Sequence, residues 1–211
     1  MRSFKKLILA CDGESASGKS TAAKLVSRKY GLLLINSGLL YRYASKLLIK
    51  FKSKNEIIFL KNRFKKINYK KISSQNLHSE EISNYASIVA KNKKIREIIN
   101  NFQIHIIKNN SKICVEGRDI ASKILAKNPK YDLAFYFKCS LDIASNRRWL
   151  DIKKKVPLKE VKKSLKKRTL MDKKRKNSPL IKVKDAILIR TDKLSKKQVL
   201  AKMSKHIEKI T

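Results

Sequence analysis

An eight-residue motif between a predicted strand and a predicted helix constrains this chain more than any other feature. Residues 13–20 read G-E-S-A-S-G-K-S, which fits the pattern G-x-x-x-x-G-K-S. The apolar run Leu7–Cys11 precedes the motif and predicts a buried strand, and apolar residues at helical spacing follow it. In such a strand, loop and helix, the loop N–H groups and the positive end of the helix dipole converge on one point. The segment is therefore predicted to bind phosphate.

The side chains of this loop fit a nucleotide triphosphate with Mg²⁺. Lys19 is long enough to reach the β- and γ-phosphates, and the Ser20 hydroxyl is placed to ligate the metal. Glu14 is unexpected, because a carboxylate in the loop repels phosphate unless it points to solvent. The residues predicted to bind ATP here are Gly13, Glu14, Ser15, Ala16, Ser17, Gly18, Lys19, Ser20 and Thr21.

Length and composition predict one cytoplasmic domain. The 211 residues suffice for a single α/β core with insertions, and no run of about 18 apolar residues or signal-peptide pattern is present. Cys11, Cys114 and Cys139 are dispersed in or beside apolar runs, which favours buried thiols over metal ligands or disulfides. No membrane partner is expected.

The formal net charge of +37 raises the possibility of a nucleic-acid partner. Most of the excess is lysine spread over every segment, so the charge follows from composition rather than from a shaped patch. Nonspecific association with RNA or DNA is therefore kept as a secondary property.

Five short apolar runs predict the strands of one parallel sheet. Helices are predicted over Leu39–Phe51 and Glu80–Lys108, the second with a break near Lys91–Lys93. The basic stretch Phe59–Asn76 is expected to contain a short exposed strand, and Asp151–Pro179 a lysine-dense helix that buries little. The predicted strands are Leu7–Cys11, Leu32–Ile35, Ile113–Val115, Leu133–Phe137 and Ala186–Ile189. This order predicts a P-loop NTPase-type α/β fold, a doubly wound five-stranded parallel sheet flanked by helices.

Three further motifs resemble those of a known protein family. Together with the phosphate loop, "NSGLLYR" at 36–42, "VEGRD" at 115–119 and "RTLMDKKR" at 168–175 resemble bacterial cytidylate kinases, and the resemblance covers essentially the whole chain. It implies the reaction MgATP + CMP ⇌ ADP + CDP in a monomer, with dCMP as a second acceptor. It also implies three parts. These are a core (1–36, 106–150 and 181–211), a nucleoside-monophosphate-binding subdomain (37–105) and a lid (151–180).

The resemblance implies which residues hold CMP. Ser37, Tyr41 and Arg42 match the "SGxxYR" element, whose arginine suits a phosphate because its planar fork binds two oxygens at once. The residues matched to cytosine reading are Ser87, Arg96 and Asp119. A carboxylate facing the exocyclic amine and an arginine facing the ring acceptors would distinguish cytosine from uracil.

The resemblance also assigns basic residues to the phosphates. Arg118 is matched to phosphate contact, and Arg147 and Arg148 to the ATP phosphates. In the lid, Arg168 and Asp172 are matched to the ribose of CMP and Arg175 to phosphate, and their i, i+4, i+7 spacing predicts one shared helix face. The residues predicted to be catalytic are Lys19, Arg118, Arg147 and Arg175.

Two other functions remain open from the residues alone. Another P-loop kinase, acting on adenylate, UMP/CMP, shikimate or dephospho-coenzyme A, would keep the motif at 13–20 but need a different acceptor pocket. A basic nucleic-acid-binding protein with a vestigial ATP site would explain the charge.

Overall fold

A computed structural model describes residues 5–210, which form two compact units. The core unit runs to Leu34 and resumes at Ser111, and the helical unit is Ile35–Asn110. The expected division into core, monophosphate-binding subdomain and lid stays a prediction. None of the helices between residues 5 and 210 is long and apolar enough to cross a membrane.

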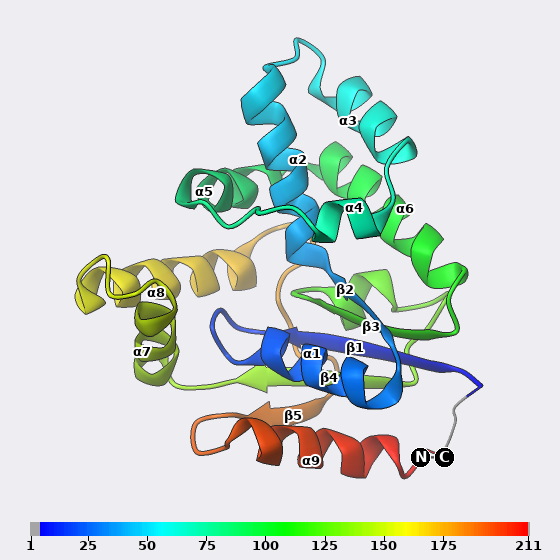
Figure 1. Ribbon diagram of the computed structural model, residues 1–211, viewed down its shortest axis with the longest axis vertical. Helices are drawn as coiled ribbons and strands as arrows, with labels where there is room; N and C mark the ends of the chain where they lie inside the picture. The colour runs from blue at the N-terminus through cyan, green and yellow to red at the C-terminus, as the bar shows by residue number, and fades with distance from the viewer. Residues whose placement is uncertain (1–4, 211) are drawn as a thin grey trace. The chain divides into compact units, whose positions relative to one another are not determined.

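The sheet has five strands in the order β2-β3-β1-β4-β5 (Figure 1). The central strand β1 pairs in parallel with β3 on one side and with β4 on the other, and β4 pairs in parallel with β5. The bounds are Leu7–Gly13 for β1, Leu33–Asn36 for β2, Lys112–Gly117 for β3, Leu133–Lys138 for β4 and Ile187–Arg190 for β5. The predicted five-stranded parallel α/β fold is confirmed, and each strand lies within one or two residues of its predicted run.

Alternation along β1 explains how the core unit packs. Leu7, Leu9 and Cys11 share one face and are fully buried against helices α1 (Lys19–Tyr30) and α9 (Lys196–Ile207) (Figure 1). The three cysteines are buried and unbridged, as predicted. Because side chains alternate along a strand, Asp12 faces the other side of the sheet. The short π-helix η1 (Ile120–Ile124), which follows β3, contacts β1 there.

Two helices between β4 and β5 pack on each other. These are α7 (Leu141–Asp151) and α8 (Leu158–Lys174), which lie side by side in Figure 1. Val161 and Leu165, one helical turn apart, are buried against Cys139 and Ala144. The stretch expected to be one lysine-dense helix is thus the end of α7, a connection and α8, and two of its residues are buried after all.

The helical unit contains five helices over Ile35–Asn110. Their bounds are Ser37–Phe51 for α2, Glu56–Lys65 for α3, Tyr69–Ser73 for α4, Glu80–Val89 for α5 and Lys93–Lys108 for α6. The predicted helix from Glu80 with a break before Lys93 is confirmed, and so is the helix ending at Phe51.

The short exposed strand expected within Phe59–Asn76 is wrong. Asn55 and Asn68 accept hydrogen bonds from Ile58 N and Lys71 N, at 3.1 and 2.9 Å, and so cap α3 and α4. Three apolar side chains of this stretch then fall on buried helix faces rather than alternating along a strand. They are Leu60, Phe64 and Ile72.

Candidate functional site

The phosphate loop has the conformation that its glycines permit. A Cβ on Gly13 would collide with the carbonyl oxygen of Phe137 and lie 2.8 Å from the Phe137 Cβ, because β4 passes directly beside the loop. Gly18 has φ +83°, a left-handed conformation, and is the N-cap of α1. Its backbone carbonyl begins the helix by accepting from Ala22 N at 3.0 Å. In the described chain, residues 5–210, no side-chain hydrogen bond caps the N-terminus of α1, which suits anion binding there.

Ser20 and Lys19 meet a buried carboxylate at the end of β3. Ser20 Oγ donates to Glu116 Oε2 at 2.6 Å, and Lys19 Nζ lies 3.9 Å from the same oxygen. The Glu116 side chain is only 3% exposed. Burial, followed by the positive charges of Arg118 and Arg168, lowers the pKa of Lys19 to about 8, although Glu116 opposes this shift. Lys19 therefore keeps its positive charge at neutral pH.

Hydroxyl and carboxylate oxygens are the donors that Mg²⁺ prefers, so the Ser20 and Glu116 pair fits the predicted metal. Within the part of the chain that the structure describes, no cluster of three His, Cys, Asp or Glu forms a protein-only metal site.

Arg118 connects the phosphate loop to α8. Its guanidinium donates through Nη1 to the Gly13 carbonyl oxygen and through Nη2 to Ser15 Oγ at 2.9 Å. Its Nε lies 2.9 Å from Asp172 Oδ2 of α8. One planar side chain thus joins the loop after β1 to helix α8, although the two segments are far apart in the sequence.

Glu14 does not point freely into solvent. Its Oε1 accepts from Lys173 Nζ of α8 at 2.6 Å, and its side chain is 13% exposed. The repulsion expected from a carboxylate in the loop is therefore offset by a positive charge supplied from α8.

Asp119 and Asp172 share a second arginine. Arg175 Nη2 lies 3.5 Å from Asp119 Oδ1, and its Nη1 lies 3.6 Å from Asp172 Oδ1. The expectation that Arg168, Asp172 and Arg175 share a helix face is wrong for Arg175. Helix α8 ends at Lys174, and Arg175 is extended with ψ 137°. Its side chain nevertheless reaches Asp172 across the helix end, whereas Arg168 is exposed on α8.

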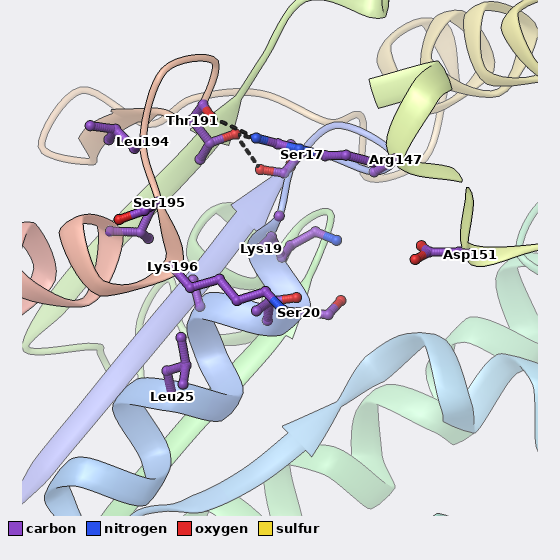
Figure 2. Close-up of a pocket in the computed structure, with 15 residues that line it drawn as sticks. Ser17, Lys19, Ser20, Leu25, Arg147, Asp151, Thr191, Leu194, Ser195 and Lys196 are labelled. Atoms are coloured by element: carbon purple, nitrogen blue, oxygen red, sulfur yellow. Dashed lines mark hydrogen bonds between the residues drawn. The ribbon is translucent and has the colours of Figure 1, made fainter. Parts of the chain in front are cut away.

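A pocket of about 470 Å³ lies over the N-terminus of α1 (Figure 2). Thr191 links two segments that line the pocket. Its Oγ1 donates to the Ser17 carbonyl and accepts from Arg147 Nη1, both at 2.9 Å. Arg147 Nη2 also donates to the Thr191 carbonyl at 2.7 Å. Besides the loop residues from Ala16 to Thr21, the lining consists of Ala22, Leu25, Arg147, Asp151, Thr191, Leu194, Ser195, Lys196 and Val199. Of the two predicted arginines, Arg147 lines this pocket and Arg148 is exposed on α7.

The helical unit carries the remaining predicted residues on α2, α5 and α6. The guanidinium of Arg96 lies over the Tyr41 ring, 5.4 Å from its centroid, and Arg96 Nη1 donates to the Ala90 carbonyl at 3.1 Å. Ser37 is buried at the start of α2, with Arg42 half-buried five residues later. Ser87 Oγ donates to the Asn84 carbonyl of its own helix at 2.7 Å. Tyr41 and Arg96 are therefore brought together by packing within this unit.

Sequence reasoning missed three residues that shape the site. Asp12 is buried and accepts from Ile120 N and Ala121 N at 2.9 and 2.8 Å. Burial raises the pKa of Asp12 to about 6, although these two backbone donors oppose the shift. Glu116 and Thr191 are the other two. All three lie at or just after the carboxyl ends of strands, and that position was the signal for them.

Known proteins resemble this chain along almost its whole length. A family model described as cytidylate kinase matches residues 9–209. The cytidylate kinase of Mesomycoplasma hyopneumoniae (strain 7448) is 30% identical over 217 residues, covering 96% of this chain and 93% of that protein. The cytidylate kinase of Rickettsia akari (strain Hartford) is 29% identical, covering 97% and 93%. A shikimate kinase structure from Bacteroides thetaiotaomicron has a TM-score of 0.53 at 10% identity over 96% of this chain and 98% of that one, a likeness of fold alone.

Proposed function

Because this chain belongs to the cytidylate kinase family, we propose that it transfers the γ-phosphoryl group of ATP to CMP and so yields ADP and CDP. The observation that carries the proposal is a phosphate loop whose lysine and serine both meet Glu116. A loop built in this way supports a nucleotide triphosphate as donor.

On the donor side, the chain supplies an amide-lined cradle and positive charge. The loop N–H groups and the N-terminus of α1 would bind the phosphates, with the Lys19 ammonium neutralising the charge on the transferring group. Ser20 and Glu116 would hold Mg²⁺, which would offset the negative charge of the donor phosphates. Arg147, fixed by Thr191 at the edge of the pocket, would contact the donor phosphates from the opposite wall.

On the acceptor side, the proposed residues read a monophosphate with a cytosine base. Arg42 would bind the phosphate of CMP, with Ser37 and Tyr41 beside it on α2. Asp119 suits the exocyclic amine of cytosine, and a guanidinium such as Arg96 suits the ring acceptors. The remaining residues in this proposal are Ser87, Arg168 and Asp172. Use of dCMP as a second acceptor is part of it.

Catalysis in this proposal consists of positioning and charge compensation. Two anionic nucleotides repel each other. Arg118 donates to Ser15 of the phosphate loop, and Arg175 contacts Asp119, so these two guanidinium groups would add to the positive charge of Lys19. An oxygen of the CMP phosphate attacks the γ-phosphorus, and ADP leaves with the bridging oxygen, so no covalent enzyme intermediate forms.

An acceptor screen tests the proposal. Purified protein with MgATP would be offered CMP, dCMP, UMP, AMP and shikimate, and ADP release would be measured for each. CMP should give the highest kcat/KM. ADP release with AMP or shikimate but not with CMP would overturn the proposal in favour of another P-loop kinase.

Monomeric action in the cytoplasm belongs to the same proposal. Nonspecific association with nucleic acid stays a prediction from the net charge of +37. One measurement distinguishes the kinase from a nucleic-acid-binding protein. RNA binding that is retained at physiological salt, together with no CMP phosphorylation, would favour the alternative of a vestigial ATP site.

A further inference from the structure

Glu14 is the one acidic side chain inside the phosphate loop, residues 13–20. A carboxylate at this place adds negative charge where a tri-anionic or tetra-anionic tail must bind, so it opposes ATP binding by simple repulsion. In the structure this charge is matched by Lys173 Nζ at 2.6 Å. The Glu14 side chain is largely buried, whereas Lys173 is 43% exposed. The two residues therefore differ in exposure. Glu14 is enclosed in the loop, whereas Lys173 lies at the surface of α8.

The last turn of α8 touches the loop at two neighbouring residues. Lys173 reaches Glu14 directly, and Asp172 reaches Gly13 and Ser15 through Arg118. These contacts place the end of α8 beside the first half of the loop. A lysine side chain has four rotatable carbon–carbon bonds in its stem, so the Lys173 ammonium can change partner while its helix stays in place.

The two partners available to Lys173 differ in charge. Glu14 offers one negative charge, and the phosphate tail of ATP in the same loop offers three or four. A cation already positioned beside the loop gains more from the tail than from the carboxylate. Ordering this side chain on the phosphates also costs less conformational entropy than ordering a lysine from elsewhere on the surface.

We propose that Lys173 is an additional ATP-phosphate-binding residue, which Glu14 holds beside the loop until nucleotide arrives. In the nucleotide-free protein Glu14 acts as an internal substitute for phosphate. When ATP binds, the ammonium of Lys173 passes from Glu14 to the phosphates, and Glu14 then remains as a repulsive charge that weakens the bound state. The inference rests on the part of the proposed function in which this loop binds ATP, and not on the choice of CMP as acceptor.

This exchange has a thermodynamic signature. Glu14→Gln removes both the competing partner of Lys173 and the repulsion, so ATP binding should tighten by roughly fivefold. In a Lys173→Met background only the repulsion is removed, and the gain should fall to roughly twofold. By the same cycle, Lys173→Met should weaken ATP binding by roughly twofold in the native chain and by roughly fivefold in the Glu14→Gln chain.

The experiment is a double-mutant cycle of Glu14→Gln and Lys173→Met in the full chain, read as the dissociation constant of MgATP by calorimetry without CMP. Lys174→Met is the matched control, because it removes the same charge from the adjacent exposed position of α8. Lys174→Met should change the dissociation constant of MgATP by the same factor in the native chain and in the Glu14→Gln chain. If either variant fails to fold by circular dichroism, Glu14→Ala and Lys173→Leu replace it in the cycle.

The sign of the coupling decides the inference. A larger loss from Lys173→Met when Glu14 is absent supports the exchange of partners. A larger loss when Glu14 is present would mean that the ion pair persists in the ATP complex, and it would overturn the proposal. Equal losses, or no effect of Glu14→Gln, would also overturn it. Tight ATP binding without CMP phosphorylation would remove the proposed function while leaving this cycle decisive.

Discussion

Arg118 and Asp172 form an ion pair with 2.9 Å between Nε and Oδ2, and the same guanidinium donates to Ser15 Oγ at 2.9 Å. Both side chains are less than one-fifth exposed. The end of β3 and the end of α8 are therefore tied to the phosphate loop by one arginine. Because a guanidinium carries five donors in a fixed plane, neither lysine nor an apolar residue can replace its contacts with Gly13, Ser15 and Asp172 together.

Arg118→Met should lower kcat/KM for the transfer reaction by about 10²–10³-fold, since it removes a positive charge next to the transferring group. Arg118→Lys should recover only part of this loss, because an ammonium cannot bridge the loop and Asp172 at once. Arg190→Met, an exposed arginine at the end of β5, is the control. Steady-state kinetics with varied ATP and CMP measure the effect, and an Arg118→Met enzyme with native kcat/KM would contradict it.

Lys19→Ala should remove nearly all turnover while CMP binding remains within about twofold of the native value, because the lysine serves the donor phosphates. The loss in kcat/KM should be roughly 10²–10³-fold or more. Lys24→Ala removes an exposed lysine of the same helix and should leave turnover intact. Turnover is measured by coupled ADP release and CMP binding by calorimetry. A parallel loss of CMP affinity would place Lys19 in both substrate sites.

Asp119→Ala should raise the KM for CMP by roughly tenfold or more and leave the KM for ATP nearly unchanged, since the carboxylate is assigned to the cytosine amine. The variant also frees Arg175 from a contact at 3.5 Å. Asp142→Ala, whose carboxylate is 71% exposed on α7, is the matched control. Equal increases in both KM values would show that Asp119 acts on Arg175 and the phosphates rather than on the base.

The sequence was informative wherever a local pattern determines the structure. Leu7–Cys11 is apolar without a break because β1 is buried on both faces, so both the strand and the loop after it could be predicted. Within Phe59–Asn76, the weak alternation of Ile67, Tyr69 and Ile72 is typical of a strand, but Asn55 and Asn68 cap the helices that form there. Leu60 and Phe64, four residues apart, carried the helical signal.

The contacts between distant segments could not be predicted in the same way. The pairing of Glu14 with Lys173 depends on where α8 ends, and no local pattern fixes that end, as the extended conformation of Arg175 shows. Resemblance supplied Asp119, Asp172 and Arg175 as site residues, but it did not predict that Arg175 contacts both carboxylates. Asp12 was missed because it closes an apolar strand, and only the placement of η1 shows that its carboxylate has two backbone donors.

Asp12 should make the stability of the fold depend on pH. Its pKa is about 6 in the folded protein, mainly because burial disfavours the charged form, against an ordinary value of 3.8. Protons therefore bind the folded state more tightly than the unfolded one. The resulting stabilisation is complete below pH 3.8 and is lost as the pH rises through 6, by about 3 kcal/mol at most.

Asp12→Asn removes this titration while keeping an acceptor oxygen for the η1 donors. The free energy of unfolding of the variant, measured relative to the native chain by urea denaturation, should therefore increase by roughly 2–3 kcal/mol between pH 4 and pH 7.5. Asp151→Asn, an exposed carboxyl at the end of α7, controls for the loss of one negative charge from this basic chain. A difference between Asp12→Asn and the native chain that stays constant over this range would show that Asp12 is ionised in the fold at pH 4.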